Sequence, residues 1–237
     1  MIHRIRSRIR FNEERRRKWV EGWASSLPEG SKVLDVGAGV GQYRPLFANC
    51  RYYAHDFGQE PATVGNYTKL DYVSDITEIP VEDASFDVVL CTEVLEHVPQ
   101  PIEAIREMGR ILRPGGRLLC SAPLGSWLHQ EPYHFYGGYT PHWYRQFLPQ
   151  FGLEVEAIER NYGFFSYFGQ EAIRFNTFIA PRYVFKKGLI GLLLVPVWAV
   201  TWPVSRLFTL VAPALDRLNL EVIATVGYHV VATKRGP

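Results

Sequence analysis

The chain has 237 residues, 47% of them hydrophobic, and a formal net charge of +2. This length and apolar content predict one sizeable α/β core with additions, and so small a charge gives no argument for nucleic acid as partner. Cys50, Cys91 and Cys120 lie far apart and outside any CxxC pattern, so they indicate neither a disulfide framework nor a zinc site. We expect a reducing cytoplasm and no bound metal.

The N-terminal segment is locally basic. "MIHRIRSRIRFNEERRRK" holds eight Arg or Lys residues against two Glu, and no apolar stretch follows that would make it a secretory signal. Trp19, Val20 and Trp23 have helical spacing, so 12–27 is predicted to be a lead-in helix. Residues 1–30 are expected to form this lead-in and 31–237 the main domain.

Strands and helices then alternate along the chain. The alternation predicts a Rossmann-like, doubly wound, mainly parallel seven-stranded sheet, with a ligand site at the carboxyl ends of its strands. The expected strands are 32–37, 51–56, 67–75, 85–93, 116–123, 152–160 and 221–234, and the expected helices are 42–48, 101–112 and 140–150.

The loop after the first strand carries Gly37, Gly39 and Gly41. Its pattern is G-x-G-x-G, which lacks the third glycine spacing of a dinucleotide fingerprint. Free amides at the start of the following helix would favour an anion such as a phosphate or carboxylate. Asp56, about 20 residues after the loop, can accept hydrogen bonds from ribose hydroxyls. A nucleoside ligand is therefore predicted.

Three motifs in order, "LDVGAGVG", "FDVVLCTEVLEHV" and "RILRPGGRLLCSAP", resemble the small-molecule group of class I S-adenosylmethionine-dependent methyltransferases. The resemblance covers Val33 to Pro123 and implies S-adenosyl-L-methionine as cofactor. It implies that the three glycines admit the methionine part and that Asp56 binds the ribose. Asp75 and Ile76 would flank the adenine, Thr92 and Glu93 would lie near the methyl group, and Asp35 would order the loop. For Asp75, capping of the following turn is the alternative.

The segment "HQEPYHFYGGYTPHWYRQF", residues 129–147, is dense in aromatic and histidine side chains. It is the candidate acceptor site, because such residues provide flat walls and proton acceptors. His134 is the first candidate for a general base, followed by His129 and His97. The alternatives are an aromatic core corner and, for His97, a solvated helix pair with Glu96.

We expect the acceptor to be a hydroxyl of a small or lipid-linked metabolite or glycan. "PYH", "YTPHW" and "FGLEV" are similar to segments in methyltransferases of cell-surface glycans, quinones and other small metabolites. One alternative is RNA methylation, suggested by the basic N-terminus, but nucleic acid is not expected because "CTEVLEH" replaces the Asn-Pro-Pro-Tyr motif. The other is a non-catalytic binding protein, although every cofactor position is chemically competent. The sequence predicts no oligomeric state.

An apolar insert, 188–215, precedes the last expected strand. It begins with the uncharged run "GLIGLLLVPVWAVTWPVS" between Lys187 and Arg206. Pro196 and Pro203 interrupt this run, so two short helices are expected to form a hairpin. We expect the hairpin to dock on the inner face of a membrane as a peripheral contact. The alternative is a helical cap buried on the domain or in a dimer interface.

Overall fold

A computed structural model describes residues 11–59, 67–218 and 224–236. The chain divides into two compact units. The sheet unit comprises Arg15–Arg160 and Gly227–Pro237, and the helical unit comprises Met1–Glu14 and Asn161–Val226. Of the basic segment 1–18, from which the RNA hypothesis arose, residues 1–10 lie outside the described residues.

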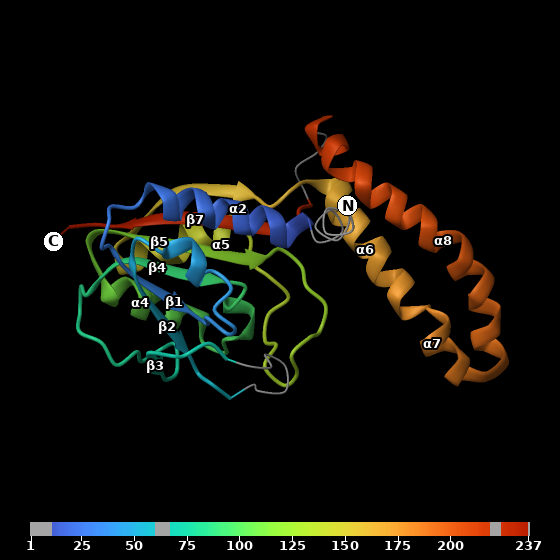
Figure 1. Cartoon of the computed structure of the whole chain (residues 1–237), viewed down its shortest axis with the longest axis horizontal. Coiled ribbons are helices and arrows are strands. Elements are labelled where there is room, and N and C mark those ends of the chain that lie inside the picture. The colour runs from blue at the N-terminus through green and yellow to red at the C-terminus, as the bar shows by residue number, and fades with distance from the viewer. Residues whose placement is uncertain (1–10, 60–66, 219–223, 237) are drawn as a thin grey trace. The chain divides into compact units, whose positions relative to one another are not determined.

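The sheet unit is built on a seven-stranded sheet with the order β3-β2-β1-β4-β5-β7-β6. β7 is antiparallel to both of its neighbours, β5 and β6, and the other pairs are parallel (Figure 1). The predicted fold class is confirmed. The strands are β1 (Lys32–Val36), β2 (Arg51–Asp56), β3 (Tyr72–Val73), β4 (Phe86–Thr92), β5 (Leu112–Pro123), β6 (Leu153–Arg160) and β7 (Gly227–Lys234).

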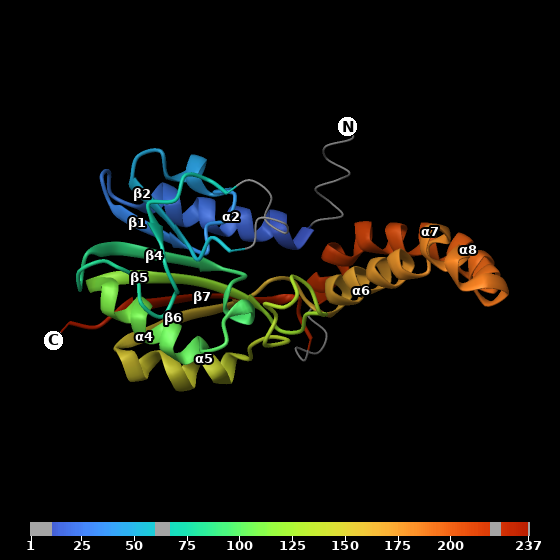
Figure 2. The same cartoon turned by 90° about the horizontal axis from the view of Figure 1, so that it is seen from below.

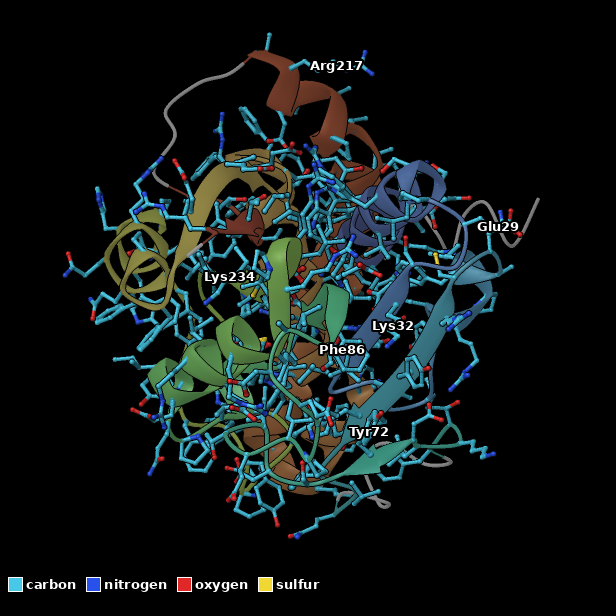
Figure 3. All side chains as sticks on the ribbon, turned by 90° about the vertical axis from the view of Figure 1, so that its left-hand side faces the viewer. Glu29, Lys32, Tyr72, Phe86, Arg217 and Lys234 are labelled. Carbon is cyan, nitrogen blue, oxygen red and sulfur yellow. The ribbon has the colours of Figure 1, made fainter. Side chains whose placement is uncertain are left out.

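The direction of the strands determines which edge can hold a ligand. Figure 3 looks onto the edge where β1 and β4 begin, at Lys32 and Phe86, and where the antiparallel β7 ends, at Lys234. The carboxyl ends of the parallel strands therefore lie at the opposite edge. In open α/β sheets that edge is the one that binds ligands.

Helices cover both faces of the sheet. α4 (Pro101–Ile111) and α5 (Pro141–Phe147) lie on one face, and α2 (Phe11–Ser26) lies on the other (Figure 2). Each face of the sheet has its own hydrophobic core, and successive strand residues point to opposite faces. Val89 packs in the core on the α4 side, and Val88 packs in the core on the α2 side. The short 3-10 turns are η1 (Arg44–Phe47), η2 (Leu95–His97) and η3 (Leu148–Phe151). The lead-in helix is confirmed as α2.

Two elements near the glycine loop are shorter than predicted. The expected helix 42–48 is only the single turn η1, because the Cys50 amide already bonds the Phe47 carbonyl and β2 starts at Arg51. The expected strand 67–75 contributes only β3. The residues before it bond elsewhere, with the Thr68 amide donating to the Gly39 carbonyl at 2.9 Å.

The helical unit contains a long helix and a shorter one packed beside it. α8 (Gly188–Leu215) continues through Pro196, Pro203 and Pro213, so the expected division into two short helices is wrong. The hairpin partner of α8 is α6 (Phe164–Phe178), and α7 (Pro181–Val184) and η4 (Phe185–Lys187) form the turn between them (Figure 1). η5 (Asp216–Leu218) follows α8, and the Asp216 carboxylate accepts bonds from the Gly163 and Phe165 amides at 3.0 and 2.9 Å.

A buried histidine in β7 makes the stability of the sheet unit depend on pH. His229 stacks on Trp19 at 4.7 Å, and burial, helped by the charges of Arg16 and Arg15, lowers its pKa from 6.5 to about 3. As the pH falls below 6.5, His229 is protonated in the unfolded chain, whereas in the folded chain it stays neutral down to about pH 3. This contribution to stability is therefore complete above pH 6.5 and is lost towards pH 3.

The variant His229→Phe keeps a ring on Trp19 but cannot titrate. As the pH is lowered from 6.5 towards 3, we expect the free energy of unfolding of the natural chain, relative to this variant, to fall by about 1.4 kcal/mol for each pH unit. Urea unfolding at a series of pH values measures the difference and removes the contributions of all other groups. A difference that stays constant with pH would contradict the buried neutral histidine.

Candidate active site

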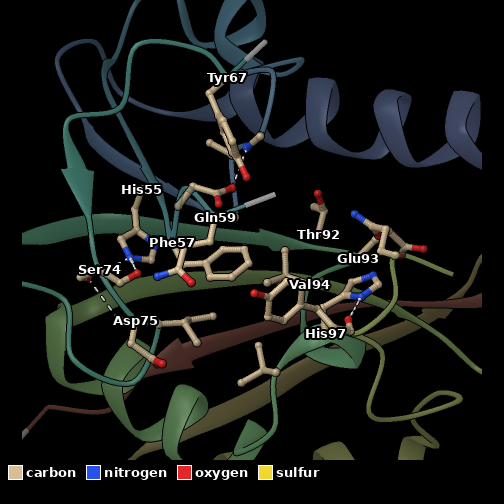
Figure 4. Close-up of a pocket in the computed structure, with 18 of the residues that line it drawn as sticks. His55, Phe57, Gln59, Tyr67, Ser74, Asp75, Thr92, Glu93, Val94 and His97 are labelled. Carbon is tan, nitrogen blue, oxygen red and sulfur yellow. Dashed lines mark hydrogen bonds between the residues drawn. The ribbon is translucent and has the colours of Figure 1, made fainter. Parts of the chain in front are cut away.

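A cavity of about 700 Å³ opens at the carboxyl edge of the sheet unit. Residues of the glycine loop, the end of β2, the turn after β3, the end of β4 and the segment 130–135 line it. Figure 4 shows His55, Ser74 and Asp75 on one side of this space and Thr92, Glu93 and His97 on the other. Segments far apart in the sequence thus meet at the predicted position.

The glycine loop is tied to the end of β2. The amides of Gly37 and Ala38 donate to the His55 carbonyl at 2.9 Å, and the Gly39 amide donates to Asp56 Oδ2 at 3.0 Å. The expectation of free amides is therefore wrong for these three residues. Gly37 has φ +74°, and a Cβ there would lie 2.4 Å from Val94 Cγ2, so only glycine fits.

The two acids that flank the loop have different surroundings. Asp56 lines the cavity, and its Oδ1 accepts a bond from the Gly58 amide at 3.1 Å. Asp35 is buried beneath the loop, where it accepts a hydrogen bond from the Tyr52 hydroxyl. Burial raises the pKa of Asp35 to about 7, although the Tyr52 bond opposes the shift. Of the two, Asp56 is the one that can reach a ligand.

Asp56→Ala is expected to weaken S-adenosylmethionine binding by about 1–3 kcal/mol, the usual loss for a hydrogen bond to a charged group. Calorimetric titration measures this change. The matched control is Asp56→Asn, which removes the charge and keeps one acceptor oxygen for the Gly39 amide or the Gly58 amide. A change in turnover with unaltered affinity in the alanine variant would rule out ribose binding by Asp56.

The turn after β3 supports both interpretations of Asp75. Asp75 Oδ1 accepts bonds from the Thr77 amide and hydroxyl at 2.8 and 2.7 Å, as a turn-capping residue does. Asp75 and Ile76 also line the cavity, where Ile76 offers an apolar surface. Gly41 and Asp35 are the predicted cofactor residues that the described lining does not include.

The end of β4 places a carboxylate in the cavity. Glu93 has φ +53°, a backbone conformation that is uncommon for this residue type and often marks a functional site. Ser121 Oγ donates to Glu93 Oε1 at 2.8 Å, and Arg16 Nη1 lies 3.1 Å from Oε2. Arg16 also donates from Nε to the Tyr43 hydroxyl at 3.1 Å. Thr92, beside Glu93, lines the cavity as well.

Arg16 was not predicted as a site residue, although it is largely buried and lines the cavity. It comes from α2, the lead-in helix, far in sequence from every motif. The only signal in the sequence was the excess of basic residues before the first strand. Through Arg16, which lines the cavity and contacts Glu93, α2 contributes to the site.

The three candidate bases form one cluster. Their ring centroids are 4.8 Å apart for His97 and His129, 4.6 Å for His129 and His134, and 5.7 Å for His97 and His134. Of these three histidines, His97 is the one among the described residues that line the cavity. His134 Nε2 instead lies 2.9 Å from Ser126 Oγ, and His129 Nδ1 lies 2.7 Å from the Trp127 carbonyl.

The hydrogen bond of His97 determines which nitrogen can act as a base. Its Nδ1 lies 2.5 Å from the Tyr133 carbonyl, an oxygen that can only accept, so Nδ1 carries the proton. The Nε2 lone pair is then available. Burial, together with the neighbouring His129 and His134, lowers the pKa of His97, while the Tyr133 carbonyl opposes the shift. The ring is neutral at physiological pH.

Two of these histidines, together with Glu96, have the composition of a cation site. Glu96, His97 and His129 place ligand atoms within 4.8 Å of one another. Burial, and secondarily the charge of Glu93, raises the pKa of the Glu96 carboxyl to about 8. Two imidazoles and a carboxylate can hold Zn²⁺. Sequence spacing gave no hint of this group, because the loop of 129–138 brings its third member back to the first two. Metal-free chemistry stays a prediction.

Comparison with known proteins finds matches to the middle part of the sheet unit. Residues 34–120 match the model of a methyltransferase domain family. A ubiquinone biosynthesis O-methyltransferase of Aliivibrio fischeri (strain MJ11) is 39% identical over 102 residues, a match to 39% of this chain and 44% of the relative. The chain thus spans less than half the length of the curated relatives that it matches.

Solved structures share the fold over most of the chain. The phosphoethanolamine N-methyltransferase 2 of Haemonchus contortus superposes with a TM-score of 0.53 at 16% identity, over 93% of this chain and 52% of that one. The cyclase SpnF superposes with a TM-score of 0.54 at 20% identity, over 93% and 81%. The shared fold alone does not select a reaction. The family match is more specific than the fold: residues 34–120 match a methyltransferase domain, and most of the three motifs that resemble class I S-adenosylmethionine-dependent methyltransferases lies within this segment.

Proposed function

We propose that this chain transfers a methyl group from S-adenosylmethionine to a hydroxyl of a small or lipid-linked acceptor. The observation that carries the proposal is the cavity, in which Gly39, Asp56 and His97 line one space of about 700 Å³. The name of the Aliivibrio relative, an O-methyltransferase, supports oxygen as the accepting atom.

The cavity residues fit the parts of the cofactor. Asp56 offers carboxylate oxygens to the ribose hydroxyls, and Ile76 offers an apolar surface to the adenine. The amino-acid end of S-adenosylmethionine carries both charges, and the Arg16–Glu93 pair lines the cavity with one side chain of each sign. Because Gly37 has no side chain, the backbone of the glycine loop packs directly against Val94 at the wall of the cavity.

Methyl transfer from a sulfonium is a direct displacement. The acceptor oxygen forms a bond to the methyl carbon while the carbon–sulfur bond breaks. The electron pair of the broken bond stays on the sulfur. The protein must align the three atoms and exclude water. The hydroxyl proton must also leave, and we assign it to Nε2 of His97, the lone-pair nitrogen of the cavity-lining histidine. His129 and His134 pack against this ring.

The experiment that tests the proposal has two stages. Calorimetric titration with S-adenosylmethionine and its demethylated product should show binding of both. A screen of hydroxylated acceptors with a labelled methyl donor should then identify products that carry the label on oxygen. If neither cofactor form binds, the enzymatic proposal fails. Label on nitrogen or carbon would overturn only the choice of a hydroxyl.

A further inference from the structure

We infer that the helical unit embeds in the surface of a lipid bilayer through the α6–α8 pair, the segment 164–215. The inference does not depend on methyl transfer. α8 is the one described helix that is long and apolar enough to cross a membrane, yet only 11% of its most apolar 18-residue window is buried. Its most exposed apolar side chains are 61–82% accessible: Leu189, Ile190, Leu193, Val200, Val204 and Leu207.

The outward surface of the pair carries few charges: α6 has one ion pair, with Arg174 Nη1 2.7 Å from Glu171 Oε1, and α8 has one arginine. In the sequence of α8, Arg206 is the only charged residue among 28, and its guanidinium lies 4.6 Å from the Trp202 ring. α6 adds exposed phenylalanines, including Phe168 and Phe178. A surface helix in water normally confines its apolar residues to one stripe and places charges opposite. On α8 the exposed side chains, such as Leu193, Val200 and Leu207, are apolar, and no charged face lies opposite them.

The buried part of the contact between the two helices consists of small and hydrogen-bonding side chains, and beside it Phe208 of α8 packs edge-on against Phe168 of α6. Asn176 Nδ2 donates to Ser205 Oγ at 3.0 Å, and Thr201 Oγ1 donates to Asn176 Oδ1 at 2.7 Å. Thr209 is fully buried, and its hydroxyl lies 3.2 Å from where a Cβ of Gly169 would stand. Small residues and hydrogen-bonding side chains inside, with large apolar ones outside, is the arrangement of helices in lipid and the reverse of that in water.

The chain path excludes a single crossing. The helical unit leaves the sheet after Arg160 and returns at Gly227, and Arg160 is the register partner of Tyr228. Both ends of the segment must therefore be on the same side of a membrane. α6, with 15 residues, is roughly 22 Å long and cannot cross a hydrocarbon core of about 30 Å by itself.

The positions of the basic residues favour an in-plane orientation. Basic residues occur along the whole pair, with Arg174 in α6, Arg182 and Lys186 at the turn, and Arg206 in α8. Helices lying parallel to the surface let each of these side chains reach the headgroups, whereas upright helices would carry some of them into hydrocarbon. Residues 161–218 contain six basic and two acidic residues, which favours anionic headgroups.

Flotation of the full-length chain tests the inference. We expect it to float with phosphatidylcholine vesicles that contain phosphatidylglycerol, and less with phosphatidylcholine alone. The triple variant Leu193→Gln, Val200→Gln and Leu207→Gln removes lipid-facing groups that make no buried contact, so it should stay folded and remain at the bottom. Leu128→Gln, a change at a 73% exposed residue of the sheet unit, should float like the natural chain.

The inference fails if the full-length chain stays soluble without detergent and does not float with either vesicle. Sedimentation then shows what covers the apolar surface: a dimer that the triple variant dissociates would identify a second copy of the chain. Circular dichroism melting confirms that each variant is folded. Because cofactor binding is measured without lipid, failure of flotation leaves the methyltransferase proposal intact, and failure of cofactor binding leaves this one intact.

Discussion

Methyl transfer should fall by about 10²- to 10⁴-fold in His97→Asn, with affinity for S-adenosylmethionine nearly unchanged. Asparagine can donate from its amide nitrogen to the Tyr133 carbonyl, which His97 Nδ1 contacts at 2.5 Å. It has no basic nitrogen to replace Nε2. The substitution therefore keeps the anchor of the 129–138 loop and removes only the proton acceptor. Initial rates at saturating acceptor, together with calorimetry of the cofactor, separate the two effects.

The pH profile gives a second measure that a merely structural role would not change. A neutral base with a lowered pKa makes the rate rise with pH on the acidic side of 6.5 and level off above it. This limb should disappear in His97→Asn. His134→Ala is the comparison, since His134 was the first choice from the sequence and its Nε2 lies beside Ser126. If that variant loses a hundredfold while His97→Asn keeps a third of the rate, the base is His134.

The central strands β1, β4 and β5 could be predicted because each contains a run of apolar residues near turn residues. Leu34, Val89 and Leu118 are fully buried, as a sheet covered on both faces requires. The edge that carries the site follows from the alternation of strands with helices, whereas the strand order was not predicted. Asp56, Thr92 and Glu93 follow or end strands, so their positions on the cavity were predictable as well.

The remaining features depend on contacts that no local pattern contains. Arg16 reaches Glu93 only because α2 packs across the sheet, and Glu96 meets His129 only because a loop folds back. The glycine-loop amides were expected to be free, but the His55 carbonyl and Asp56 accept bonds from them. Prolines suggested two helices where α8 is continuous, since proline costs a helix one hydrogen bond but does not forbid its φ angle.

Gly39→Val is the second substitution expected to have a large effect, a loss of S-adenosylmethionine affinity of at least about 100-fold, or roughly 2.7 kcal/mol. Gly39 lines the cavity, and its amide and carbonyl are held by Asp56 and Thr68. The loop therefore has little freedom to move away from a new side chain. A branched side chain here would occupy space that we assign to the methionine part of the cofactor.

The strain of the substitution must be separated from the steric block. Gly39 has φ +50°, where a residue with a Cβ costs roughly 1–2 kcal/mol, too little to unfold a stable domain. Gly115→Val is the matched control, because Gly115 has φ +77°, no atom within 4 Å of the place where a Cβ would stand, and no part in the cavity lining. It should lose a similar amount of stability in thermal melting and bind the cofactor normally. Equal loss of affinity in both variants would mean that strain spreads through the domain, and normal binding by Gly39→Val would place the cofactor outside this cavity.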